Sequence, residues 1–199
     1  MIDVLFGKVL YSNQLNFDTQ EIIKNIDQTR KSRNYATEIT DNDTLYVLNK
    51  TKHKELKKIV DKEIKEFANN VMQYTNDFAI TTSWFTEVDV MESGQFHRHS
   101  NSFFSGVLYL NVDEYTGNII FENFDESITL ATNQHNMLNA KSFTVTPKNG
   151  LILIFPSELW HTVGYNDSNI IRYSLAFNVM PVGTVGHAYD DSHMRIKIV

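Results

Sequence analysis

From about Ile80 onward, short runs of β-branched and aromatic residues alternate with turn residues. Such runs are typical of β-strands, and about eight of them in close succession indicate a sandwich or a barrel. The predicted strands are TTSWFTEVDVM, GQFHRH, FFSGVLYLNV, GNIIFEN, KSFTVT, LILIF, HTVGY and IRYSLAFNV. This pattern constrains the fold most, because the second half of the chain must pack sheet against sheet.

The first third of the chain predicts helices instead. Asp18, followed by Glu21, has the form of a helix-capping pair, and isoleucines follow at helical spacing. From about Thr51 to Gln73, apolar residues form one stripe of a longer helix, with lysine and glutamate on its other side. We expect His53 on that charged, solvated face.

Helices followed by a run of strands predict a mainly β fold with N-terminal helices: a double-stranded β-helix (jelly roll, cupin-like) buttressed by helices. The 199 residues, of which 42% are hydrophobic, suit one well-buried domain. We expect a mainly helical buttress in residues 1–79, the jelly-roll core in residues 80–180 and a tail in residues 181–199.

Charge and composition exclude several classes of partner. The formal net charge is -6 and basic residues form only short clusters, so nucleic acid is not expected to bind. The chain has no cysteine, which excludes disulfides and thiolate ligands and fits a cytoplasmic protein. No stretch has the apolar length of a membrane span or the form of a signal peptide. The oligomeric state is left open, with a homodimer as one alternative.

Three histidines predict a metal site. His97 and His99 are two residues apart in a predicted strand, so both side chains point to the same face. His161 follows the apolar strand LILIF, where the end of a strand presents it at the mouth of a barrel. Borderline metals such as iron and zinc favour imidazole ligands, and three of them leave positions open for catalysis. The same spacing also occurs on solvated strands, so it does not decide the matter alone.

The order of the segments HRHSNSFFSGVLYLNVDEYTGNIIFEN, TVTPKNGLILIFPSELWHTVGYN and IIRYSLAFN resembles a known family. These segments are similar to 2-oxoglutarate and Fe(II)-dependent oxygenases that carry SGVxYL and FPSxLxH signatures, relatives of the prolyl hydroxylases. The resemblance extends over about residues 83–178, and the helical first third matches only loosely.

The resemblance implies a role for individual residues. It places the metal ligands at His97, His99 and His161, with no catalytic side chain beyond the metal centre. It places the residue that holds the far carboxylate of 2-oxoglutarate at Arg172, where a guanidinium can grip a carboxylate with two hydrogen bonds. On a strand, Ser174 faces the same way as Arg172 and can add a hydroxyl group. The prolyl hydroxylase relatives have a tyrosine whose hydroxyl contacts the same carboxylate, and its position corresponds to Tyr109 in this sequence.

One position departs from the family pattern. The usual ligand set is two histidines and one carboxylate, and His99 takes the place of the carboxylate. A neutral imidazole leaves the metal more positive by one unit, which should weaken Fe(II) retention. Asp89, Glu92 and Asp113 are alternative carboxylates, but none has the required spacing to His97.

The expected activity is oxidative decarboxylation of 2-oxoglutarate to succinate and CO2, coupled to hydroxylation of an unidentified small molecule or protein side chain. Fe(II) and 2-oxoglutarate are the expected cofactor and co-substrate, with ascorbate as a reductant. Two alternatives stay open: a cupin-like three-histidine enzyme that does not use 2-oxoglutarate, and a non-catalytic jelly-roll binding module. An irregular loop over residues 125–140 is expected near the site, which should have an apolar lining from Phe103, Phe104, Phe121 and Phe155.

Overall fold

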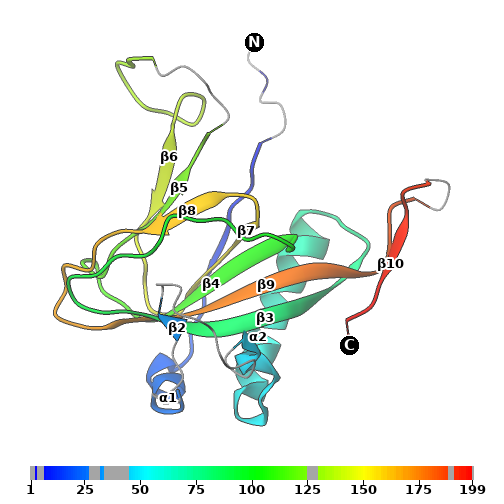
Figure 1. Cartoon of the computed structure of the whole chain (residues 1–199), viewed down its shortest axis with the longest axis horizontal. Coiled ribbons are helices and arrows are strands. Elements are labelled where there is room, and N and C mark those ends of the chain that lie inside the picture. The colour runs from blue at the N-terminus through cyan, green and yellow to red at the C-terminus, as the bar shows by residue number, and fades with distance from the viewer. Residues whose placement is uncertain are drawn as a thin grey trace.

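A computed structural model describes residues 3, 7–26, 32–33, 45–124, 130–187 and 191–198, and every structural statement concerns these residues. Two mainly antiparallel sheets form a jelly roll, which confirms the predicted fold class (Figure 1). The seven-stranded sheet has the order β1-β7-β4-β9-β3-β2, with β10 paired to β9, and the three-stranded sheet has the order β6-β5-β8. The large sheet contains β1 (Tyr11–Gln14), β2 (Ser32–Arg33), β3 (Asp77–Val88), β4 (Phe104–Asn111), β7 (Leu151–Pro156), β9 (Arg172–Val185) and β10 (Met194–Ile196), and the small sheet contains β5 (Ile119–Glu122), β6 (Ser142–Val145) and β8 (Trp160–Val163).

The predicted strands from β3 to β9 are confirmed, except for the segment GQFHRH. The structure also has strands that the sequence pattern does not predict. Within the expected helical buttress, β1 pairs with β7 along the sheet edge, with Tyr11 opposite Ile154. The sequence YSNQ has no alternation of apolar and polar residues, and an edge strand can form without one because it buries only part of its surface.

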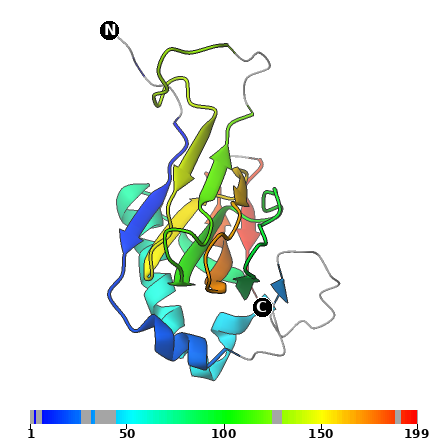
Figure 2. The same ribbon diagram turned by 90° about the vertical axis from the view of Figure 1, so that its left-hand side faces the viewer.

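The helices occur where the sequence predicts them. The short helix α1 (Thr19–Lys24) begins after Asp18, whose carboxylate accepts a hydrogen bond of 2.9 Å from the backbone N–H of Gln20. The longer predicted helix is a composite: two 3-10 turns, η2 (Val47–Asn49) and η3 (Thr51–His53), lead into α2 (Lys54–Lys65), which continues as the π-helical segment η4 (Glu66–Val71). Figure 2 shows the blue and cyan helices together below the strands.

The large sheet has two apolar faces, and the alternation of residues along β4 shows how they arise. Leu108 and Leu110 pack in the cluster that includes the helices, whereas Val107 and Tyr109 pack in a second cluster with residues of the small sheet. Successive side chains of a strand point to opposite faces, so both clusters draw on the same strands. The inner face, between the two sheets, is where the polar residues of the candidate site lie.

His53 does not lie on the solvated helix face that the sequence indicates. Its side chain is buried, with 4% exposed, and its ring meets the edge of Phe85 at a centroid distance of 5.3 Å. The chain turns from η3 into α2 at this residue, which breaks the single helical period on which the expectation rests. Burial lowers the pKa of His53 to about 4, so the imidazole is neutral in the folded protein at neutral pH.

This burial predicts a pH dependence of stability. The unfolded chain takes up a proton at His53 below about pH 6.5, while the folded protein takes it up only near pH 4. The contribution of the neutral His53 side chain to stability is therefore complete above pH 6.5 and is lost as the pH falls toward 4. Urea unfolding measures the free energy of unfolding at about pH 7 and about pH 4.5. Its decrease between these pH values should be about 2 kcal/mol larger in the native protein than in His53→Leu. Equal losses in the two proteins would contradict this account.

Candidate metal centre

His97 and His161 are held together by their own backbones. His161 lies on β8, and His97 lies in a loop that touches β8 through a single bridge. The N–H of each residue donates a hydrogen bond of 2.9 Å to the carbonyl oxygen of the other. This reciprocal pair fixes two imidazoles that are far apart in the sequence.

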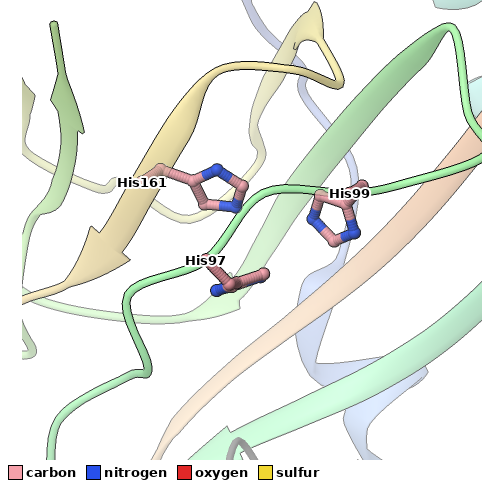
Figure 3. Close-up of side chains that lie close together, drawn as sticks. All are labelled: His97, His99 and His161. Atoms are coloured by element: carbon pink, nitrogen blue, oxygen red, sulfur yellow. The ribbon is translucent and has the colours of Figure 1, made fainter. Parts of the chain in front are cut away.

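His99 completes the group from the same loop. Its ring centroid lies 5.0 Å from that of His97 and 5.2 Å from that of His161, and the latter two centroids are 4.5 Å apart. One ring nitrogen from each residue lies within 4.8 Å of the others. In Figure 3 the three side chains converge on one space, two from the loop and one from β8.

The prediction that His97 and His99 lie in a regular strand is wrong. Residues 94–99 form no strand and pair with neighbouring backbone only at isolated points, including His97 with His161. Further along, the N–H of His99 donates a hydrogen bond of 3.0 Å to the carbonyl of Ser157. The two rings nevertheless reach the same space, with their centroids 5.0 Å apart.

Hydrogen bonds orient two of the rings. His97 Nδ1 lies 2.9 Å from the carbonyl of Gln95, and His161 Nδ1 lies 2.8 Å from the carbonyl of Leu159. A carbonyl only accepts, so each Nδ1 carries a proton, and in the neutral form of each ring the lone pair for a metal is then on Nε2.

The electrostatics favour neutral imidazoles. Burial lowers the pKa of His161 to about 4, and burial together with the neighbouring histidines lowers the pKa of His99 to about 3. A neutral ring is the form that binds a metal. The donor set, its orientation and its protonation therefore fit a borderline divalent cation such as Fe(II).

No carboxylate of the described residues belongs to this group. Asp113 instead accepts hydrogen bonds from the Ser168 hydroxyl and the Tyr115 backbone N–H. Asp89 and Glu92 also lie outside the group, so the alternatives to His99 gain no support from the geometry.

Arg172 lies deep between the sheets, with 1% of its surface exposed. Its Nη1 donates a hydrogen bond of 3.1 Å to the Ser174 hydroxyl, which is 2.6 Å from the hydroxyl of Thr86. The guanidinium carbon lies 5.1 Å from the ring centroid of Tyr109. The Nε of Arg172 and the hydroxyl of Tyr109 have no hydrogen-bond partner among the described residues. Burial lowers the pKa of Arg172 and raises the pKa of Tyr109 to about 12.

A single cavity of about 60 Å³ joins the two parts of the site. All three histidines line it, and so do Arg172 and Ser174. The structure thus brings the predicted residues to one place, with Tyr109 packed behind the guanidinium.

The wall of the cavity differs in part from the expected one. Phe121 and Phe155 lie near His161, at centroid distances of 5.9 and 5.0 Å. Of the four expected phenylalanines only Phe155 lines this cavity, whereas Phe103 and Phe104 line a larger neighbouring cavity that His99 also lines. The ring of Phe104 also packs in the core that includes the helices.

Thr86 and Trp84 are cavity residues that the sequence analysis does not identify. They lie opposite Ser174 and Ala176 in the register of β3 and β9. The alternation in TTSWFTEV marks them as sharing one face, but only the pairing with β9 shows which face that is.

The fold and the site define a jelly-roll protein with a partly buried three-histidine group and a buried guanidinium. Residues 82–178, almost half of the chain, match the model of a family described as "Putative 2OG-Fe(II) oxygenase". Through this region the chain is similar to the 2-oxoglutarate and Fe(II) oxygenases, a family whose cofactor and co-substrate are Fe(II) and 2-oxoglutarate.

Solved structures confirm the fold. A viral collagen prolyl hydroxylase from Paramecium Bursaria Chlorella virus-1, in complex with 2-oxoglutarate, has a TM-score of 0.54 and 13% identity over 89% of this chain and 98% of its own. HygX from Streptomyces hygroscopicus, with nickel and 2-oxoglutarate bound, has a TM-score of 0.55 and 8% identity over 86% of this chain and 82% of its own.

Other matches are partial. An oxidoreductase of the 2OG-Fe(II) oxygenase family from Burkholderia pseudomallei has a TM-score of 0.47 and 12% identity over 67% of this chain, which spans about half (52%) of that protein. Among curated proteins, no sequence matches this chain significantly. No described helix has the length and apolar character that a membrane span requires.

The geometry predicts one metal ion per chain. Anaerobic titration calorimetry with Fe(II) or Co(II) should show a single site in the native protein. His97→Ala, His99→Ala and His161→Ala should each lower the metal affinity by about 100-fold or more, because the loss of a residue that only supports a ligand already lowers it by about 10- to 100-fold. His135→Ala, in an exposed loop, is the matched control and should bind as the native protein does. Native affinity in His99→Ala would exclude His99 as a ligand.

Proposed function

We propose that this chain decarboxylates 2-oxoglutarate to succinate and CO2 and couples this reaction to hydroxylation of a substrate. The observation that carries the proposal is the buried guanidinium of Arg172, which has no carboxylate partner among the described residues and shares a cavity with the three histidines. Dioxygen is the oxidant of this reaction: one of its oxygen atoms enters succinate and the other enters the hydroxyl group of the product, and bound Fe(II) would supply the activation of dioxygen.

A buried charge without a counter-charge costs several kcal/mol of desolvation. Folding tolerates this charge only if other interactions offset the cost, and a ligand that brings a carboxylate removes it. We assign Arg172 to the far carboxylate of 2-oxoglutarate, with the hydroxyls of Ser174 and Tyr109 as additional hydrogen-bonding groups. The Tyr109 hydroxyl supports this role because it is buried and lacks a hydrogen bond in the described structure.

His97, His99 and His161 are the proposed ligands of Fe(II). Three neutral imidazoles leave the charge of a divalent cation uncompensated, and Arg172 adds another positive charge to the same cavity. The doubly negative 2-oxoglutarate offsets most of this charge. Replacement of the usual carboxylate by His99 therefore makes the co-substrate more important for retention of the metal.

The apolar part of the cavity wall has a second task. The rings of Phe155 and Trp84 lie beside His161 and His99, at centroid distances of 5.0 and 5.9 Å. Apolar side chains at these positions limit the access of water to the reacting atoms.

The substrate is either a small molecule or a protein side chain, and the groove next to the centre is its proposed binding place. His99 also lines a larger cavity of about 510 Å³, together with Arg98, Tyr74 and Phe103. Tyr74 and Phe103 form an edge-to-face pair at 5.8 Å, and both are partly exposed. We propose a cytoplasmic location from the absence of cysteine, and no binding to nucleic acid from the net charge of -6.

The two alternatives differ in what they require of Arg172. A three-histidine enzyme without 2-oxoglutarate, or a binding module without chemistry, leaves the buried guanidinium without a partner. Neither alternative explains why this charge lies in the same cavity as the histidines.

Substitution of Arg172 tests the proposal. Arg172→Gln should lower the affinity of the metal-loaded protein for 2-oxoglutarate by about 100-fold, because truncation of a buried charged partner costs about 2–5 kcal/mol. Calorimetry with 2-oxoglutarate, and succinate release in the presence of Fe(II) and ascorbate, measure the effect.

Arg195→Gln is the control for this experiment. Arg195 is exposed on β10 and lines neither of the two cavities. Its loss should leave 2-oxoglutarate affinity unchanged. Native affinity in Arg172→Gln would contradict the proposed seat for the carboxylate.

A further inference from the structure

The three histidines are not held in the same way. The rings of His97 and His161 are each oriented by a carbonyl two residues earlier in the chain. The ring of His99 makes no hydrogen bond to any described residue, and it follows a loop without regular secondary structure. Something other than a ring hydrogen bond must therefore set its place.

The turn between β7 and β8 supplies this support. Within it, the carbonyl of Ser157 accepts the backbone N–H of His99 at 3.0 Å, and the carbonyl of Leu159 accepts from the ring of His161 at 2.8 Å. Residues 156–159 thus hold two of the three histidines. A displacement of this turn would move both rings relative to His97.

A buried chain of hydrogen bonds anchors the turn to the large sheet. The hydroxyl of Ser157 lies 2.8 Å from that of Ser105 on β4, and both residues are 1% exposed. The Ser105 hydroxyl also lies 2.8 Å from Oδ1 of Asn178 on β9, whose Nδ2 donates to the hydroxyl of Thr82 on β3 at 3.0 Å. The chain crosses three adjacent strands, in which Ser105 and Thr82 are both register partners of Asn178.

The chemistry of these groups fixes the direction in which protons are donated along this chain of hydrogen bonds. An amide oxygen only accepts, so Ser105 gives its single proton to Asn178. The Ser105 oxygen is then left as an acceptor, and Ser157 must donate to it. The donor and the acceptor of each hydrogen bond between Ser157, Ser105 and Asn178 are thus assigned. Removal of the Ser105 hydroxyl leaves the Ser157 hydroxyl without an acceptor and the Asn178 Oδ1 without a donor.

We propose that Ser105, Ser157 and Asn178 are positioning residues for the metal centre, and that they act by fixing the turn at residues 156–159. This inference rests on the proposed function, because it takes the three histidines as metal ligands. The hydroxyl of Ser105 touches neither the metal nor the co-substrate in this account. It sets the geometry of His99 and His161 through Ser157.

Ser105→Ala tests the inference, with Ser83→Ala as the matched control. Ser83 is also on the large sheet and is also 1% exposed, and its hydroxyl accepts one hydrogen bond, from the N–H of Leu48, but it lies on the helix-facing side. Both variants lose a buried hydroxyl. Only Ser105→Ala should weaken Co(II) binding, by 10- to 100-fold in calorimetry.

A spectroscopic readout separates positioning from a general loss of stability. The visible absorption spectrum of bound Co(II) reports the number and geometry of its ligands and should change in Ser105→Ala but not in Ser83→Ala. Ser105→Thr retains the hydroxyl and should restore the native spectrum. Ser157→Ala and Asn178→Leu should show the same change as Ser105→Ala, which keeps the test decisive if one variant does not fold.

The outcomes distinguish this inference from the proposed function. A native protein that binds no Co(II) or Fe(II) would overturn the proposed function and the inference with it. A native protein that binds one ion, with unchanged affinity and spectrum in the folded Ser105→Ala and Ser157→Ala variants, would overturn the inference alone.

Discussion

The positive charge of Arg172, enclosed between two sheets, is the constraint on which the site depends. A guanidinium with 1% of its surface exposed needs polar partners, and the described structure offers it one hydroxyl and the face of a tyrosine ring. We therefore propose that the cavity that it shares with the three histidines binds an organic anion and a cation together. Either ligand alone would leave part of this electrostatic arrangement unsatisfied, so we expect the two to bind cooperatively.

The fold supplies this arrangement from two kinds of structure. The proposed carboxylate end is built on the long strands β3, β4 and β9, whose register sets Thr86 opposite Ser174 and Ser174 opposite Tyr109. The proposed metal end is built on a loop and a turn, which are held by a few isolated backbone hydrogen bonds. The hydrogen bond between the buried hydroxyls of Ser105 and Ser157 joins the turn to the strands, and in our proposal it keeps the histidines of this irregular region in place.

Much of this site could be predicted from the sequence, because its residues fall in segments with a clear pattern. His161 follows an apolar strand, and Arg172 and Ser174 alternate along a strand that the pattern also identifies. The environment of His97 and His99 could not be predicted, since a loop that pairs with a strand only at isolated points has no sequence pattern of its own. The burial of His53 and the place of Phe104 depend on which face of the sheet the helices cover, and strand alternation leaves that choice open. Part of the expected loop at residues 125–140 lies outside the described residues, and residues 130–140 contain no strand or helix.

Anomalous X-ray scattering at the iron edge, from crystals grown anaerobically with Fe(II) and 2-oxoglutarate, tests the account most directly. We predict one anomalous peak at about 2.0–2.2 Å from Nε2 of His97, His99 and His161, with a carboxylate of 2-oxoglutarate bound to the guanidinium of Arg172. An iron position away from any of these rings, or 2-oxoglutarate bound without contact to Arg172, would contradict it.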